Sequence, residues 1–182
     1  YSQAVNGLQL ENRRGRVTRI AAAVDATLPV VKKAIATRAD LLIVHHGMFW
    51  SGLQPWTGST FERMRLALEN NLAIYSAHLP LDAHPTLGNN ARIAAAMQLT
   101  PGGGFLDYKG LPVGVTCEVD LELDEVIARF TGALEGGRVH VCAGGPRRTR
   151  KIGISSGGSG SEVAAAAKAG VDTFITGEGP HW

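Results

Sequence analysis

A recurring strand–helix–strand pattern most constrains what this chain can fold into. Residues 17–26 and 40–44 are short apolar runs of the kind that form buried strands, and residues 27–39 between them have apolar positions on one helical face. Residues 59–71 and 72–77 continue the alternation with a second helix and a third strand. Strands connected in this way pair in parallel through right-handed crossovers. The pattern therefore predicts an α/β fold.

Local signals predict where the helices begin. Thr27 can cap the helix over 27–39, and Pro29 suits its first turn. Ser59 with Glu62 has the spacing of a capping box. We also expect a short helix over 89–99 with an asparagine cap.

The second half of the chain shows the same kinds of segment. We expect strands over 111–119, 138–143, 150–156 and 171–176, and helices over 123–134 and 161–170. The stretch "TPGGGF" at 100–105 is the best linker candidate. We therefore expect a first α/β lobe over 1–100 and a second over 101–182.

Two segments of the chain resemble each other. Residues 19–47 and 151–179 both consist of a strand, a polar turn, a helix, a small-residue turn, an aspartate and a strand. Laid together, Asp40 falls on Asp172 and His46 on Glu178. Strand–helix–strand units also look alike by chance, so both explanations stay open here. A true repeat would give two related lobes with reactive side chains at matching strand ends.

Composition excludes several classes of protein. The 182 residues are 45% hydrophobic, with a net charge of +2, which argues against a dedicated nucleic-acid or membrane-surface protein. No run of apolar residues is long enough to span a bilayer. Cys117 and Cys142 lie in apolar stretches without CxxC spacing, and we expect reduced core thiols in a cytoplasmic protein.

The chemistry-bearing residues follow predicted strands. His45 and His46 end one strand, and His78 ends the next, with Asp82 four residues further on. Ligands of open α/β sheets collect at such carboxyl ends. Neighbouring residues of a strand point to opposite faces, but Gly47 permits a turn, so the two rings can reach two centres a few ångströms apart. Imidazole with carboxylate suits zinc, iron, cobalt, nickel or manganese better than magnesium, and two such ions lower the pKa of a shared water.

Other polar residues have ordinary explanations beside the functional ones. His84 suits a turn or the rim of a site, His140 a solvated loop, and Asp25 a loop role, although Asp25 also follows a strand. The glycine-rich segment 155–162 is either a tight turn or a phosphate cradle. The basic segment 144–151 is either a solvated loop or a phosphate-holding one.

Several stretches together carry a resemblance to a known family. They are "NGLQ" (6–9), "LLIVHHGMFW" (41–50), "HLPLDAHPTLGNNARIA" (78–94), "GVDTFITGE" (170–178) and the "SSGGSG" turn. In order and over nearly its whole length, the chain resembles the NIF-three-like dinuclear metal proteins, also named GTP cyclohydrolase 1 type 2 homologues, in the short form without an inserted domain.

The resemblance implies a fold and an assembly. It implies two similar α/β lobes with mixed, mainly parallel sheets and a metal site in the cleft between them. It also implies a toroidal hexamer of identical subunits whose sites face an internal cavity.

The resemblance also implies roles for particular residues. His45, His46 and Asp82 would hold two divalent transition metal ions, and His78 would be the catalytic proton shuttle. Three residues would surround these ligands or face the substrate, namely His84, Glu178 and His181. The family's closing His/Glu motif does not occur in these 182 residues. We therefore expect a truncated chain with part of the coordination shell, completed by Glu178, His181 or solvent.

Two functions from different classes remain. The first is a metal-dependent hydrolase acting on a nucleotide or pterin-like small molecule, in line with the family name. The alternative is a non-catalytic metal-binding, metal-delivery or regulatory adaptor protein. Loss of activity in His45→Ala would favour the enzyme, whereas metal loading without turnover would favour the binder. We expect neither a membrane nor a nucleic-acid partner.

Overall fold

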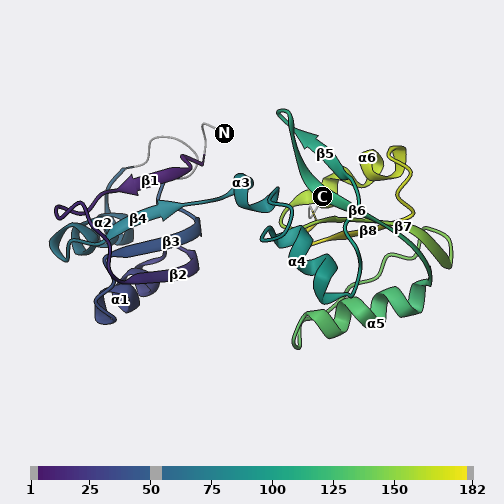
Figure 1. Cartoon of the computed structure of the whole chain (residues 1–182), viewed down its shortest axis with the longest axis horizontal. Coiled ribbons are helices and arrows are strands. Elements are labelled where there is room, and N and C mark those ends of the chain that lie inside the picture. The colour runs from purple at the N-terminus through teal and green to yellow at the C-terminus, as the bar shows by residue number, and fades with distance from the viewer. Residues whose placement is uncertain (1–3, 50–54, 180–182) are drawn as a thin grey trace. The chain divides into compact units, whose positions relative to one another are not determined.

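The computed structural model describes residues 4–49 and 55–179 and divides into two units (Figure 1). The first unit is Tyr1–Pro80 and the second is Leu81–Trp182. Each contains one four-stranded mixed sheet with helices, which confirms the predicted α/β fold. Within the described ranges, no helix combines the length and hydrophobicity needed to cross a membrane.

The first unit contains a mostly parallel sheet in the order β1-β4-β3-β2. Its strands are β1 (Gly7–Leu10), β2 (Ile20–Asp25), β3 (Leu41–His46) and β4 (Ala73–Ser76), and its longer helices are α1 (Leu28–Ala36) and α2 (Gly58–Glu69). Strands β2, β3 and β4 pair in parallel, and β1 joins β4 antiparallel. The observed elements follow the predicted alternation closely, and Pro29 lies in the first turn of α1 as expected.

Helices α1 and α2 provide one side of the core of the first unit. Val31 of α1 and Ala67 of α2 are fully buried, and they belong to one apolar cluster with Leu42, Val44 and Ile74 of the sheet. Because side chains alternate along a strand, the neighbouring residues of β2 and β3 lie on the opposite face. That face is more open, and on it Ile20 and Val24 are exposed.

The second unit contains a sheet in the order β5-β6-β7-β8. Its strands are β5 (Gly104–Tyr108), β6 (Leu111–Glu122), β7 (Arg148–Ser155) and β8 (Thr173–Thr176). Its helical segments are α4 (Asn89–Ala96), α5 (Leu123–Ala133), η1 (Ser159–Glu162) and α6 (Val163–Lys168), and the short α3 (Leu79–Asp82) spans the division between the units. Strands β7 and β8 are parallel, whereas β5, β6 and β7 pair antiparallel.

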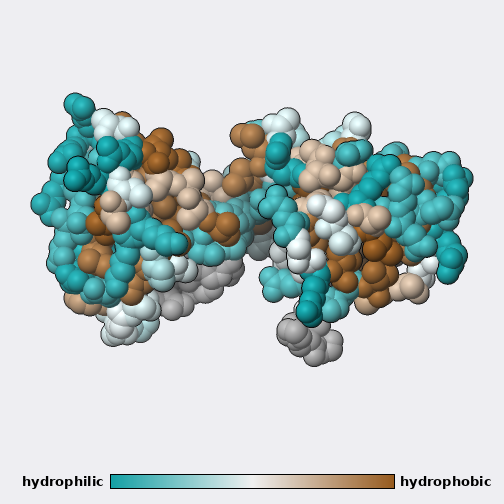
Figure 2. Space-filling model, turned by 90° about the horizontal axis from the view of Figure 1, so that it is seen from below, coloured by the Kyte–Doolittle hydropathy of each residue, from teal (hydrophilic) through white to brown (hydrophobic). Residues whose placement is uncertain are grey.

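The sheet of the second unit has helices on both sides. Helices α5 and α6 lie on opposite sides of it (Figure 1). Met97, at the end of α4, and Val126 of α5 pack in one cluster with Ile152 and Ile154 of β7. Phe105 and Ala166 belong to a separate cluster. Figure 2 shows that hydrophobic residues also reach the surface between hydrophilic ones in both units.

The internal repeat predicted from the sequence is present in the structure. The segments β2-α1-β3 and β7-α6-β8 both form a parallel strand pair joined by a helix. The pairing registers match position for position, because Ile20 lies opposite Leu41 and Ile152 lies opposite Thr173. The two units are therefore built around the same motif.

Several local expectations differ from the structure. Helix α2 has Thr57 at its N-cap, and Glu62 pairs with Arg65, so the predicted capping box is wrong. Helix α4 has Gly88 at its N-cap, so the predicted asparagine cap is also wrong. Residues 138–143 form no strand, and within them Cys142 is exposed, which contradicts the expected core thiol, whereas Cys117 is buried as expected.

The division between the units precedes the expected boundary at 100/101. Helix α4, which the sequence analysis assigned to the first lobe, contacts β6, β7 and α5 of the second unit. The glycine-rich linker candidate instead leads directly into β5. Composition marked this stretch as a loop, but packing of α4 decides which unit the preceding residues belong to.

Candidate metal site

Two neighbouring parallel strands of the first unit deliver three histidines to one edge of the sheet. His45 and His46 are the last residues of β3, and His78 lies two residues beyond the end of β4. Strands β3 and β4 pair in parallel up to Val44 and Ser76, so their carboxyl ends lie side by side. The apolar strands thus position three imidazoles at the place that the sequence predicted.

The three rings form a compact cluster. The ring centroids of His45 and His46 are 4.6 Å apart, and that of His78 lies 4.7 Å from His45 and 5.3 Å from His46. Each residue offers one nitrogen, and these nitrogens all lie within 4.8 Å of one another. The two adjacent rings therefore meet in a single cluster with His78, a geometry in which one ion can contact all three residues.

Hydrogen bonds fix the tautomers of the two adjacent histidines. Nδ1 of His45 lies 3.0 Å from the carbonyl oxygen of Ala77, and Nδ1 of His46 lies 2.6 Å from Oδ1 of Asp25. A carbonyl or carboxylate oxygen can only accept, so in both rings Nδ1 carries the proton and donates it. The lone pair is then on Nε2, which is the arrangement that metal-binding histidines use.

The third histidine is neutral at physiological pH. Burial, together with the nearby charges of His45 and His46, lowers the pKa of His78 from 6.5 to about 4. A neutral imidazole has a lone pair to donate to a metal, whereas a protonated one has none. This lowered pKa suits a ligand better than a group that must give up a proton near neutrality.

The donor set fits a transition metal ion. Imidazole nitrogen is a preferred ligand of zinc, copper, iron and nickel, and it is a poor ligand for magnesium or calcium. Three clustered imidazoles, two of them oriented by hydrogen bonds, therefore match this class of ion. The identity of the ion and the number of ions stay predictions.

Three further predicted site residues, Asp82, His84 and Glu178, lie in the second unit. Asp82 ends α3, and its Oδ1 accepts a hydrogen bond from the Asn89 amide at 2.8 Å. Nδ1 of His84 accepts hydrogen bonds from the backbone N–H groups of Thr86 and Leu87, which favours a turn role. His181 lies outside the described residues. The assignment of Asp82 as a metal ligand stays a prediction.

Glu178 and the glycine-rich segment pack against each other through their backbones. The N–H of Glu178 donates to the carbonyl oxygen of Gly157 at 2.9 Å, and the N–H of Gly160 donates to that of Glu178 at 3.1 Å. A Cβ atom at Gly160 would lie 2.6 Å from the Glu178 carbonyl oxygen. This close approach accounts for glycine at position 160 and favours a tight turn over a phosphate cradle.

The basic segment 144–151 contributes surface ion pairs. Arg148 pairs with Asp120 and Glu122, and Arg150 also pairs with Asp120, at exposed positions on β6 and β7. His140, in the preceding segment, is exposed as expected. Residues 148–151 belong to β7, so the loop prediction is wrong for that half of the segment, whose arginines form exposed ion pairs with neighbouring carboxylates.

Asp25 is the residue that sequence reasoning underestimated. Its position in the sequence favoured an ordinary loop role, but Asp25 is the last residue of β2 and hydrogen-bonds His46. The two residues are opposite each other in the parallel pairing of β2 and β3. The sequence did contain one indication of this contact, because Asp25 and His46 each lie at the end of one of two successive predicted strands.

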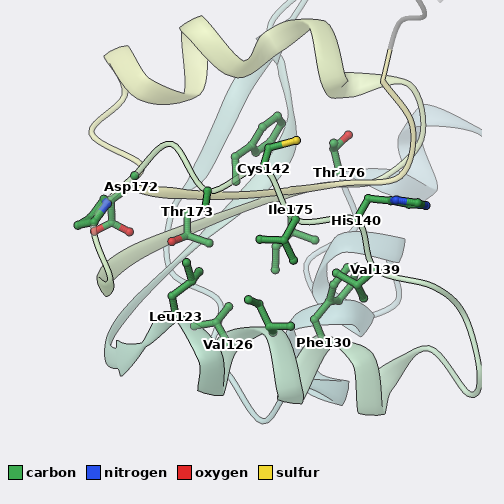
Figure 3. A pocket seen from close by; sticks show the side chains of 16 residues that line it. Leu123, Val126, Phe130, Val139, His140, Cys142, Asp172, Thr173, Ile175 and Thr176 are labelled. Carbon is green, nitrogen blue, oxygen red and sulfur yellow. The ribbon is translucent and has the colours of Figure 1, made fainter.

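The second unit also contains a cavity of about 190 Å³. Figure 3 shows α5 residues Val126 and Phe130 on one side of it and Ile175 of β8 on another. Segment 139–146 completes the lining, with His140 and Cys142 among its residues. The three clustered histidines belong to the first unit and are not among the residues that line this cavity.

Comparisons with known proteins match nearly the whole chain. A family model described as Duf34/NIF3 (NGG1p interacting factor 3) matches residues 2–181. A Deinococcus radiodurans protein named GTP cyclohydrolase 1 type 2 homolog is 41% identical, over 98% of this chain and 68% of that protein. A Chlamydia pneumoniae protein of the same name is 40% identical, over 97% and 72%.

Solved structures also match nearly the whole chain. A structural-genomics protein of unknown function called ybgI has a TM-score of 0.88 and 35% identity, covering 98% of this chain and 71% of that one. A Thermus thermophilus protein has a TM-score of 0.80 and 32% identity, covering 98% of this chain and 70% of that one.

Proposed function

The chain belongs to the Duf34/NIF3 family, and from this membership and the histidine cluster we propose that it is a metal-dependent hydrolase acting on a nucleotide or a related small molecule. The name of its relatives, GTP cyclohydrolase 1 type 2 homolog, supports the substrate class. The metal-binding part of the proposal rests on the chain's own residues.

One observation carries the proposal. Nitrogens of His45, His46 and His78 lie within 4.8 Å of one another at the carboxyl ends of two parallel strands. Burial of His78, together with the nearby charges of His45 and His46, lowers the pKa of His78 to about 4. Groups with a strongly shifted pKa are common at functional sites. An ion bound by the three nitrogens would stabilise the uncharged form of His78, and a purely structural role provides no such partner.

The three histidines would hold the ion, and a backbone carbonyl would keep one of them in place. A divalent transition metal ion supplies Lewis acidity to a hydrolytic site. The carbonyl oxygen of Ala77 keeps the His45 ring in the donor orientation that leaves Nε2 for the ion. Because its pKa is lowered to about 4, His78 is uncharged at neutral pH and has one nitrogen with a free lone pair. It would therefore act as a ligand or accept a proton, and its predicted role as a shuttle stays a prediction.

Further parts of the proposal come from the family resemblance. The resemblance adds a second ion, Asp82 as an additional ligand and a toroidal hexamer of identical subunits. The molar mass in solution, measured by light scattering after size-exclusion chromatography, tests the hexamer. An Asp82→Ala variant with reduced metal content would support the role of Asp82.

The test of function combines metal content with turnover. We expect the purified protein to take up zinc, manganese, cobalt, nickel or iron and to hydrolyse a nucleotide, and we expect His45→Ala to lose both properties. His140→Ala is the matched control, because His140 is an exposed histidine in a loop of the second unit. Equal metal content in His45→Ala and in the wild type would contradict the proposed site.

A second outcome would assign the alternative function. Metal loading that depends on His45, without turnover of any substrate in a broad panel, would identify a metal-binding, metal-delivery or regulatory protein. The histidine cluster supports the binding step in either case.

A further inference from the structure

We propose that Asp25 is a positioning residue, which fixes the tautomer and the orientation of His46 for a divalent metal ion. The inference rests on the proposed metal site and adds a residue to it. Oδ1 of Asp25 lies 2.6 Å from Nδ1 of His46, and hydrogen bonds to an ionised carboxylate are short in this way.

The backbone aligns the two side chains. Asp25 and His46 are opposite each other in the parallel pairing of β2 with β3. Directly after this pair, the N–H of Ala26 donates to the carbonyl oxygen of His46 at 3.0 Å. The backbone pairing of β2 and β3 thus continues up to and just beyond the Asp25–His46 hydrogen bond. The short side chain of Asp25 is therefore held where its carboxylate reaches Nδ1.

The bond has a chemical consequence for the ring. A carboxylate acceptor keeps the proton on Nδ1 and the lone pair on Nε2, and it makes the imidazole a more basic ligand. Without Asp25, the ring of His46 could exchange between tautomers and rotate. Asp25 would thus act on the metal through His46.

His45 and His46 are oriented by different kinds of acceptor. The acceptor for His45 is the backbone carbonyl of Ala77, which no side-chain substitution removes. The acceptor for His46 is a side chain. Substituting Asp25 should therefore change the state of His46 while leaving that of His45 unchanged.

The second copy of the internal repeat shows that the fold does not require the Asp25–His46 contact. In the alignment of the two repeats, Gly157 stands at the position of Asp25, and Glu178 stands at that of His46. The second unit forms the same parallel strand pair without an Asp–His contact. Asp25 is therefore not needed to build the strand–helix–strand motif, and its contact is specific to the histidine site.

A stabilising surface ion pair is the competing explanation. The side chains of Asp25 and His46 are 50% and 45% exposed, and exposed pairs contribute little to stability. Such a role would change the free energy of unfolding slightly and would have little effect on metal binding. The two explanations therefore differ in the metal affinity and in the tautomer of His46.

The experiment compares Asp25→Ala and Asp25→Asn with a matched control. Glu69→Ala removes another half-exposed carboxylate of the first unit, one that pairs with Arg65 in α2. Titration with Co²⁺, followed by its visible absorption, gives the affinity. Nitrogen-15 NMR of the histidine rings, recorded on metal-free protein, gives the tautomers of His45 and His46.

We expect Asp25→Ala to weaken Co²⁺ binding about 10- to 100-fold, the effect of losing the hydrogen-bond partner of a ligand. Asp25→Asn retains an acceptor oxygen and should recover part of the loss, whereas Glu69→Ala should match the wild type. In metal-free Asp25→Ala, His46 should show a mixed tautomer and His45 an unchanged one.

The Co²⁺ affinity and the histidine tautomers test the proposed function and the role of Asp25 independently. A wild type that binds no Co²⁺ would overturn the proposed function, and the NMR result would still decide whether Asp25 positions His46. Unchanged His46 tautomers in Asp25→Ala, or an unchanged affinity beside a metal-binding wild type, would overturn the inference.

Discussion

Asp40 and Asp172 make the same contacts in the two units. Each directly precedes the second strand of its repeat, and each accepts hydrogen bonds at Oδ2 from two consecutive backbone N–H groups. The donors are Thr18 and Arg19 for Asp40, at 2.9 and 3.0 Å, and Arg150 and Lys151 for Asp172, at 2.8 and 3.2 Å. The equivalence shows that the sequence repeat reflects one motif present twice.

The first prediction concerns Asp40. The hydroxyl of Thr18, and then the two backbone N–H groups, lower the pKa of Asp40 in the folded chain. The resulting stability is present above the unfolded pKa of about 3.9 and is lost as the pH falls through the lower folded value. We expect Asp40→Ala to lower the urea midpoint at neutral pH.

The control is Glu11→Ala, which removes an exposed acid of the same unit. The deficit of Asp40→Ala should shrink when the urea midpoints are measured in acid, where the wild-type carboxyl is protonated. A deficit that is the same in acid and at neutral pH would show that the charge-assisted bonds are not its cause.

Much of the fold was predictable because apolar periodicity decides it. The buried alternation of Leu42 and Val44 in β3 and the stripe of α1 are visible in the sequence. Segment 138–143 alternates like a strand but pairs with none of the described strands, because strand formation depends on a neighbour that sequence periodicity does not reveal. Strand β1 has four residues, too few for a reliable pattern.

The part of the site that depends only on where residues fall along the chain was predictable. Histidines at the ends of successive strands come together because parallel strands end at the same edge of a sheet. The contribution of Asp25 depends on the register of β2 against β3, which a single sequence does not specify. The sequence therefore predicted the imidazoles but not the acceptors that orient two of them.

The second prediction concerns packing at Gly153 in β7. A Cβ atom at this position would lie 2.6 Å from Cζ of Phe105 and 3.0 Å from Cγ1 of Val171. We expect Gly153→Ala to destabilise the protein by about 1–3 kcal/mol, because a well-packed ring must move. Urea denaturation measures the change.

Gly132 is the matched control for that substitution. It lies in α5, where an added Cβ meets no atom within 4 Å, so Gly132→Ala should stabilise by about 0.5–1 kcal/mol. Similar effects of the two substitutions would argue against the contact with Phe105 as the cause.

The third prediction concerns the core of the first unit. Leu42 is 1% exposed, at the centre of β3 beneath α1 and α2. We expect Leu42→Ala to cost about 2–5 kcal/mol in the free energy of unfolding, from lost burial and the cavity left behind. Leu87→Ala, at a residue that is 64% exposed, should change it by less than about 0.5 kcal/mol. Equal losses would contradict the assigned core.

The fourth prediction concerns the pH dependence of metal-free stability. The pKa of His78 is about 4 in the folded chain, and it is near 6.5 when the chain is unfolded. Between these values the unfolded chain binds a proton that the folded chain does not. Stability is therefore complete above about pH 6.5 and declines as the pH falls toward about 4.

The substitution His78→Gln isolates this contribution. Over that pH range, its free energy of unfolding should fall less steeply than that of the wild type, because glutamine does not titrate. Parallel curves for the two proteins would mean that His78 titrates in the folded state as it does in the unfolded state.

Anomalous diffraction at the cobalt edge, from crystals of the protein grown with Co²⁺, tests the metal site most directly. We predict a peak about 2.0–2.2 Å from one nitrogen each of His45, His46 and His78, in the range typical of imidazole–metal bonds. A cobalt peak bound only by other residues, or no peak at the three rings in a cobalt-saturated crystal, would contradict it.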